Sequence, residues 1–176
     1  PTLVSNAVKH ALILGVISIA LTLIFYVVDY TLLVTFKFML ISLAVYLGYG
    51  IYAGIGYRKE IGGYITFGKA FQHGVIVFAL SALVSTAFSV LLYNVIDPEL
   101  PGNLTEAAMV NAEEMMTKFG MPADQMDEAL AKARKDTEDR FTFVGIAKSF
   151  VWTLVFCAIF ALISGAIVKK KQPEMA

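Results

Sequence analysis

The chain has 176 residues, of which 58% are apolar and 16% are charged, and its mean hydropathy is +0.72. A water-soluble domain of this length rarely has a core large enough to hide so many apolar side chains, so the composition argues against a soluble protein and favours one embedded in lipid. The formal net charge is zero, so the overall charge does not point to nucleic acid as a partner. The single cysteine, Cys157, excludes an intrachain disulfide.

Four uncharged stretches follow one another along the chain, each long enough for a membrane-spanning helix. The hydrocarbon core of a bilayer is roughly 30 Å thick, which takes about 20 helical residues to cross. The stretches cover residues 11–28, 38–57, 70–96 and 149–168. The first lacks the small residues of a signal-peptide cleavage site after it, so we expect it to be retained. The sequence therefore predicts an all-α integral membrane protein with four transmembrane helices.

Lysine and arginine in the short connections predict the orientation, because cytoplasmic loops carry an excess of these residues. The basic residues of one side are Lys9, Arg58, Lys59, Lys69 and Lys169 to Lys171, whereas the only short loop of the other side has Lys37. We expect both termini to be cytoplasmic. This divides the chain into transmembrane helices 1 to 3 (residues 1–96), an extracytoplasmic segment (97–140), and the last helix with its basic tail (141–176).

The segment of residues 97–140 is strongly acidic and has a helical pattern. It contains eleven acidic and five basic side chains, a net charge of −6, which leaves +6 for the rest of the chain. Asn103 and Glu106 have the spacing of a capping box that starts a helix. Gly120 is a helix stop, and Pro122 suits the first turn of a second helix. Apolar residues recur at helical spacing in both halves, as Met109, Ala112, Met116 and Phe119, and then as Met126, Leu130, Ala133 and Thr137. We expect a helical hairpin that caps the outer mouth of the bundle.

Small residues recur at four-residue spacing within the predicted spans. Helices in lipid gain little hydrophobic free energy from each other, so close approach at small side chains helps to hold them together. Such ladders occur in the third and fourth spans, as Ser81, Ser85 and Ser89 and as Cys157, Ala161 and Gly165. We expect these faces to be buried within the chain. The alternative is that one glycine face, that of Gly50 and Gly54, docks on a second protein or a second copy.

Charged residues are absent from the centres of the predicted spans, where an ionisable side chain usually marks transport or catalysis. Four charged residues lie near the outer ends of the spans, namely Asp29, Lys37, Asp97 and Lys148. We expect these four to form a rim of ion pairs, with an ion vestibule as the alternative. His73 lies at the inner start of the third span and lacks the carboxylate chain of a proton relay. It is expected to be an interfacial, hydrogen-bonding histidine.

The sequence offers no constellation typical of an enzyme. The glycines of residues 48–56 lie inside a span rather than between a strand and a helix, so nucleotide binding is not expected. His10 and His73 lie near one face and most carboxylates near the other, so neither a metal site nor a Ser/His/Asp set can form. We expect no enzymatic activity, no cofactor and no metal. The hairpin contains five methionines, whose soft thioether groups suit Cu(I): Met109, Met115, Met116, Met121 and Met126. Helical spacing explains Met109, Met116 and Met126 as packing residues and leaves Met115 and Met121 over.

The connection between the second and third spans has the most distinctive pattern, Arg-Lys-Glu-x-Gly-Gly-x-Ile-x-Phe-Gly over residues 58–68. Its basic residues suit anionic headgroups, and Gly62 and Gly63 allow a tight reversal. With the four-span plan, the polar hairpin and the Lys-rich end, this turn resembles the bacterial inner-membrane proteins catalogued as domain of unknown function 4199. The resemblance implies a bacterial inner membrane with the hairpin in the periplasm, and it implies no catalytic or binding residue.

Two functions agree with these features. The one we favour is a small accessory or scaffold protein that binds a membrane-protein partner or another copy through its outer hairpin and its small-residue faces. Its candidate partner-binding residues are Glu113, Glu114, Asp136, Glu138, Asp139, Gly50 and Gly54. The alternative is a small transporter or channel for a cation or small solute. That function requires a polar line from face to face through Ser81, Ser85, Ser89, Thr86 and Thr153.

Overall fold

The computed structural model describes residues 2–172, and within that range every regular element is a helical one, apart from an isolated β-bridge between Ile65 and Lys170. The elements in chain order are α1 (Leu3–Asp29), the 3-10 turn η1 (Tyr30–Val34), α2 (Phe36–Glu60), α3 (Phe67–Leu91), the π-helical turn η2 (Leu92–Ile96), α4 (Leu100–Lys118), α5 (Ala123–Phe141) and α6 (Phe143–Val168).

Four helices are long and apolar enough to cross a membrane, which confirms the predicted fold class: α1 with η1, α2, α3 with η2, and α6. Each extends beyond the uncharged stretch that predicted it. Large apolar side chains cover their outer surface, including Val16 (64% exposed), Tyr52 (67%) and Val151 (62%). Soluble monomers rarely expose apolar surface on this scale, whereas lipid accepts it readily.

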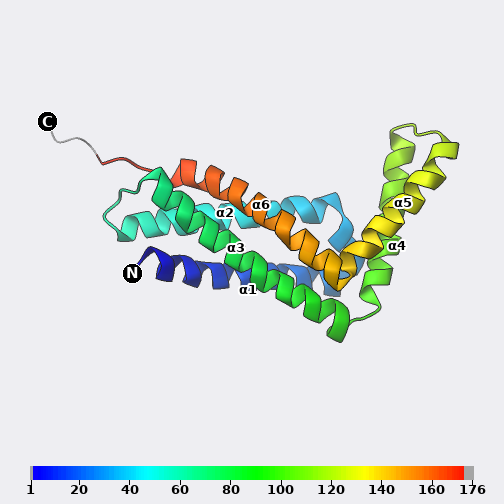
Figure 1. Ribbon diagram of the computed structural model, residues 1–176, viewed down its shortest axis with the longest axis horizontal. Helices are drawn as coiled ribbons and strands as arrows, with labels where there is room; N and C mark the ends of the chain where they lie inside the picture. Colours follow the sequence, from blue (N-terminus) through cyan, green and yellow to red (C-terminus); the bar gives the residue numbers. More distant parts are fainter. Residues whose placement is uncertain (1, 173–176) are drawn as a thin grey trace.

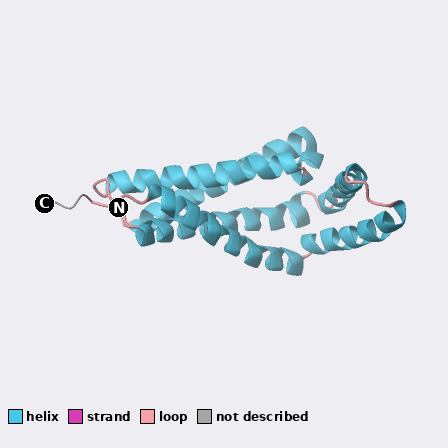
Figure 2. Cartoon of the chain, turned by 90° about the horizontal axis from the view of Figure 1, so that it is seen from above, coloured by secondary structure: helices cyan, strands magenta, loops and turns pink. Residues whose placement is uncertain are grey.

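The four long helices lie side by side in an elongated bundle, with the N-terminus and the C-terminal end of α6 at one end and the α4–α5 hairpin at the other (Figure 1). We call these the terminus end and the hairpin end. Helix α3 makes the most extensive contacts, with α1 and with α6, whereas α2 makes fewer contacts with each of its neighbours. The view from above also places the hairpin at the end opposite the termini (Figure 2).

A threonine begins each of the four long helices. Thr2, Thr35, Thr66 and Thr142 are extended N-cap residues whose hydroxyl oxygens accept hydrogen bonds from backbone N–H groups three residues later. Such a cap satisfies one of the four N–H groups that a helix start leaves without an intrahelical partner. These caps explain why the helices begin where they do, several residues before the apolar stretches.

The hairpin differs from its prediction in three ways. Helix α4 begins at Leu100, so Asn103 lies inside the helix and forms no capping box; the backbone N–H of Leu100 instead donates to Asp97 Oδ1 at 3.1 Å. The hairpin does not cap the bundle but projects away from it to one side (Figure 1). Phe119, expected in the apolar stripe, is 84% exposed. The stop at Gly120 is confirmed, because this residue has a φ of +72°, which favours glycine.

The base of the hairpin is the part that packs on the bundle. Leu100 and Leu104 of α4 are buried with Leu92 of η2, and partly buried aromatic side chains surround them, among them Tyr26 and Phe141. Thr142 is the only residue between α5 and α6. The base is therefore anchored on two sides, while α5 itself has no buried residue.

Candidate functional site

The terminus end is held together by a chain of polar side chains from three helices. His73 Nε2 lies 2.9 Å from Asn6 Oδ1, and Asn6 Nδ2 donates to Glu60 Oε2 at 3.0 Å. Since the Asn6 amide donates to the carboxylate, its oxygen faces His73, and the histidine nitrogen that meets it carries the proton. His73 is hydrogen-bonded as predicted, and its side chain is buried within the bundle (1% exposed). The ring of Tyr57 stacks on it, with the centroids 5.2 Å apart.

The distinctive turn of residues 58–68 joins this network to the end of α6. Arg58 Nη1 donates to the carbonyl oxygen of Val168 at 2.7 Å, which satisfies a C-terminal carbonyl of that helix. Gly62 and Gly63 have φ values of +98° and +87°, so the predicted tight reversal is confirmed and needs glycine. The backbone groups of Ile65 and Lys170 exchange two hydrogen bonds of 3.0 Å. The turn therefore ties α1, α2, α3 and α6 together at one end.

The charged residues near the opposite ends of the spans do not form the predicted rim of ion pairs. Asp29 Oδ1 accepts from the backbone N–H and the hydroxyl of Thr31, at 2.9 and 2.7 Å. Asp97 Oδ2 accepts from the hydroxyl of Tyr26 at 2.8 Å. Both ion pairs within the described part of the chain lie in the hairpin, between Glu114 and Lys118 and between Glu106 and Arg134. Asp29 therefore caps the turn η1, whereas Asp97 binds Tyr26 of α1 and the backbone N–H of Leu100 at the start of α4.

A cavity of about 270 Å³ lies between the four long helices in the half of the bundle nearer the hairpin. Its walls include apolar side chains and a set of hydroxyl-bearing ones, which are Ser18, Thr22, Ser42, Tyr46, Ser85, Thr86, Ser89 and Thr153. Four of the five hydroxyls named for a polar line therefore meet around one cavity. The fifth, Ser81, lies deeper, with its Oγ 2.5 Å from the Tyr46 hydroxyl oxygen. The polar line is not continuous, because fully buried Leu14, Val77 and Phe78 fill the core on the terminus side.

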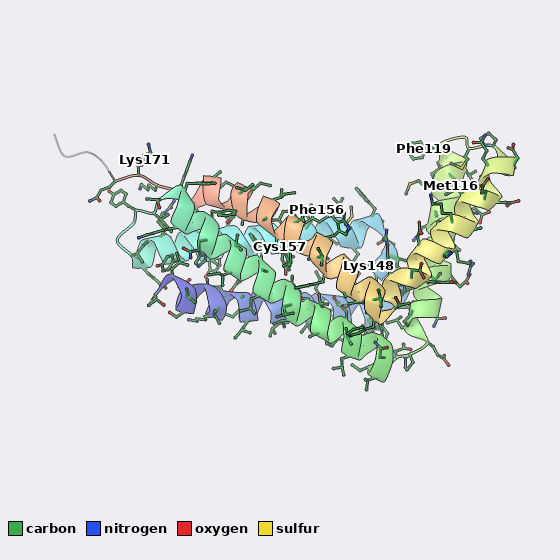
Figure 3. The ribbon with its side chains drawn as sticks, viewed as in Figure 1. Met116, Phe119, Lys148, Phe156, Cys157 and Lys171 are labelled. Carbon is green, nitrogen blue, oxygen red and sulfur yellow. The ribbon has the colours of Figure 1, made fainter. Side chains whose placement is uncertain are left out.

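The two ladders of small residues, expected to be buried within the chain, are buried only in part. The backbone of Ala161 lies against Gly74, and Gly165 lies against the backbone of Phe71, so close packing between α3 and α6 is confirmed at the terminus end. Ser85 and Ser89 line the cavity instead. Cys157 is buried in the middle of the bundle, while the neighbouring Phe156 is directed outward (Figure 3).

Gly50 and Gly54 are buried in the bundle, which corrects the prediction that they dock on a partner. A Cβ at Gly50 would overlap the ring of Phe78, and one at Gly54 would lie 2.8 Å from Cγ2 of Val168. These glycines allow α2 to approach α3 and α6 within the same chain. Gly48 and Gly56 have nothing within 4 Å of such a Cβ, so they are the open glycines of α2.

The five acidic candidates are all exposed, but the structure separates them into two groups. Glu113 and Glu114 lie in the second half of α4, toward the free end of the hairpin, and Asp136, Glu138 and Asp139 lie at its base. Met116 and Phe119 are near the free end (Figure 3). Asp136 and Asp139 share a groove of about 470 Å³ with Lys148 and Trp152 of α6. The base group therefore lies where the hairpin meets the bundle.

A bidentate ion pair crosses the hairpin. Arg134 Nη1 donates to Glu106 Oε1, and Arg134 Nη2 donates to Glu106 Oε2 at 2.9 Å. This hydrogen bonding lowers the pKa of Glu106 and raises that of Arg134. Among residues 2–172, no group of three or more His, Cys, Asp or Glu side chains is placed to hold a metal ion.

Several residues of these sites were not singled out from the sequence. Asn6 lies before the first uncharged stretch, and Glu60 lies after the second, so counting apolar residues placed both outside the spans. Ser42 and Tyr46 have the same four-residue spacing as the serine ladder of the third span, and that spacing would have identified them.

The comparison with known families agrees with the resemblance of the turn and the four-span plan. No curated protein and no solved structure matches the chain. Residues 9–170 match the family model described as "Protein of unknown function (DUF4199)", and the chain belongs to this family.

Proposed function

We propose that this protein is a small membrane accessory or scaffold protein that binds a basic partner through the acidic surface of its hairpin. One observation carries the proposal: the hairpin projects from the bundle, and all five acidic candidates on it are exposed. A projecting surface of net charge −6 attracts a positively charged one and orients it during encounter. The partner is a larger membrane protein or another copy of this chain. The protein acts by binding, not by catalysis.

The proposed location is a bacterial inner membrane, with both termini in the cytoplasm and residues 97–140 in the periplasm. The structure supports this orientation in one respect, because it brings the basic turn and Lys170 together at the terminus end, away from the acidic hairpin. A cysteine at Glu114 or Asp127, in a Cys157→Ala background, should react with an impermeant reagent added to intact cells. A cysteine at Lys170 should not. The opposite pattern would reverse the orientation.

The partner proposal is tested by affinity purification from native membranes in mild detergent, followed by identification of the bound proteins. Neutralising the five acidic candidates with Gln and Asn should release the partner and leave thermal unfolding of the bundle unchanged. Binding to the wild type should weaken as the salt concentration rises, since charges beyond a Debye length of about 8–10 Å are screened.

Two matched triple variants separate position from net charge. Neutralising Asp136, Glu138 and Asp139 changes the charge of α5 by the same amount as neutralising Asp124, Asp127 and Glu128. The first triple should weaken binding more than the second, because it removes the candidate surface at the hairpin base. Equal effects would show that only net charge matters, and the absence of any bound protein would contradict the scaffold function.

Transport of a cation or small solute is the second candidate, and the hydroxyl-lined cavity is the observation that favours it. The filled core between this cavity and the terminus end favours binding over passage. Purified protein in liposomes distinguishes the two. A solute flux that stops on replacing Ser85 and Ser89 by alanine, and that continues when the acidic residues are neutralised, would replace the scaffold function with transport.

A further inference from the structure

The cavity near the hairpin end plays no part in the proposed docking function. All four long helices contribute to its walls. On the terminus side it is closed by a layer that includes Ser81, whose Oγ donates to the carbonyl oxygen of Phe78 at 3.0 Å. A second cavity of about 230 Å³ shares Thr86, Ser89 and Thr153 with it. This second cavity reaches Arg140 and Phe141 at the hairpin base. The hollow is therefore closed toward the terminus end and continues toward the hairpin.

One hydroxyl in this cavity is buried and has no partner. Within the described part of the chain, Ser85 Oγ is the one buried side-chain oxygen or nitrogen that makes no hydrogen bond, and Ser85 lines the cavity. A buried polar atom without a partner is costly, so buried polar atoms in folded proteins are nearly always paired with another protein group, ordered water or a bound molecule. Ser85 therefore points to an occupant with a hydrogen-bonding group.

The other hydroxyls decide what that group must be. Ser18, Thr22, Ser89 and Thr153 each donate to a backbone carbonyl one turn earlier, at distances of 2.9–3.1 Å. Each hydrogen is thus committed to the helix, and the hydroxyl oxygen keeps only its capacity to accept. These four hydroxyls favour an occupant that donates hydrogen bonds, as an alcohol or a phenol does, over an ether or a ketone, which only accepts.

The charge and composition of the walls narrow the class further. The residues that line the 270 Å³ cavity include no Asp, Glu, Lys, Arg or His, so a charged occupant would lack a counter-charge in a region of low dielectric. Apolar walls such as Leu21, Phe38 and Val45 offer water no hydrogen bonds. Each water molecule in a cavity of about 270 Å³ would need two to four polar partners. An apolar molecule with one or two hydroxyl groups fits the walls better than water alone.

We propose that this cavity binds an uncharged, membrane-soluble amphiphile that carries a hydroxyl group, with its hydroxyl directed to Ser85 and its apolar body against α1 and α2. Such a molecule partitions into the bilayer and reaches the cavity from the hairpin side. This proposal is independent of partner docking, since none of the five acidic candidates lines the cavity.

The full-length protein in detergent tests the proposal with a photoreactive diazirine derivative of 1-octanol, followed by mass spectrometry of the labelled peptides. Label should concentrate on cavity residues of α1, α2 and α3. Excess 1-octanol should compete more strongly than dibutyl ether, which can accept from Ser85 but cannot donate to the other four hydroxyls, and n-octane should compete least because it has no hydrogen-bonding group. Equal competition by all three compounds, or label spread over the lipid-facing surface, would overturn the proposal.

Two substitutions of Ser85 provide the second part of the labelling experiment. Ser85→Ala should lower labelling by about fivefold, the factor expected for the loss of one neutral hydrogen bond. Ser85→Leu should lower labelling further, because the larger side chain also occupies part of the cavity. Ser164→Ala is the matched control, because Ser164 is also a buried serine but lies in α6 at the terminus end, away from the cavity. This variant should be labelled as the wild type is. Unchanged labelling in both Ser85 variants would contradict the site. The competition arm decides the question even if either variant fails to fold.

Discussion

The two ends of the bundle are built differently although their helices have similar composition. At the terminus end, glycines bring α2, α3 and α6 into close contact, and a buried polar chain links Asn6, Glu60 and His73. At the hairpin end, the same helices surround a cavity in which Ser85 Oγ is left without a partner. The terminus end is specified by tight packing, where added volume is costly. The hairpin end has room to bind. Substitutions that add volume should therefore have effects of different size at the two ends.

The largest expected effect is steric and lies at the packed end. Gly50→Val should destabilise the bundle by about 1–3 kcal/mol, the usual cost of overpacking, because its Cβ would overlap the buried ring of Phe78. Gly48→Val, on the same helix, has open space and should be close to neutral apart from helix propensity. Thermal unfolding in detergent measures both. Similar losses for the two variants would mean that α2 does not pack as described.

The second expected effect comes from the buried polar chain. Asn6→Leu should cost about 1–3 kcal/mol, because it leaves buried His73 without its hydrogen-bond partner. Gln72→Leu is the control, since Gln72 is exposed next to His73 in the chain. The double change Asn6→Leu with His73→Phe should cost less than the sum of the two single changes, because no unpaired polar group then remains at the buried position. Additive losses would argue that the contact contributes nothing.

The third prediction concerns the hairpin end, where added volume should cost little stability. The four-residue ladder suggested that Ser85 lies in a tight helix contact, but it lines a cavity. Ser85→Leu should therefore change stability by less than about 1 kcal/mol, since the cavity accepts the added volume. Ala161→Leu is the comparison at the packed end, where Ala161 is fully buried against the backbone at Gly74. It should lose more stability, and the reverse order in thermal unfolding would contradict the contrast between the two ends.

The smallest expected effect is a pH dependence confined to the hairpin. The hydrogen bonds from Arg134 lower the pKa of Glu106, so the contact is fully present above the ordinary glutamate pKa and is lost as the pH falls through the lowered value. Both side chains are open to solvent, so the effect on stability is small. Amide hydrogen exchange in α4 and α5 should become faster on acidification in the wild type. Arg134→Gln should remove this dependence, and an equal response in that variant would assign it to other carboxylates.

The acidic hairpin shows how sequence patterns can predict the elements and still miss their placement. Its two helices and the stop at Gly120 followed from local signals. Its position did not follow, because Tyr26 and Leu33, which pack against the cluster of Leu100 and Leu104, are far from them in the chain. Phe119 was expected in a buried stripe but is exposed, because helical spacing alone does not show whether another part of the chain covers that face.

The sequence by itself determined the number and approximate extent of the spanning helices, the acidic hairpin, the glycine reversal and the family. Each of these depends on length, charge or backbone conformation, which are local properties. Only the tertiary structure decided which faces turn inward. A spanning helix is apolar all round, and lipid and core are both apolar, so hydrophobic periodicity cannot distinguish an inner face from an outer one. For this reason Gly50 and Gly54 lie inside the bundle, Ser85 faces a cavity, and Asn6 meets His73, and none of these positions follows from the apolar pattern alone.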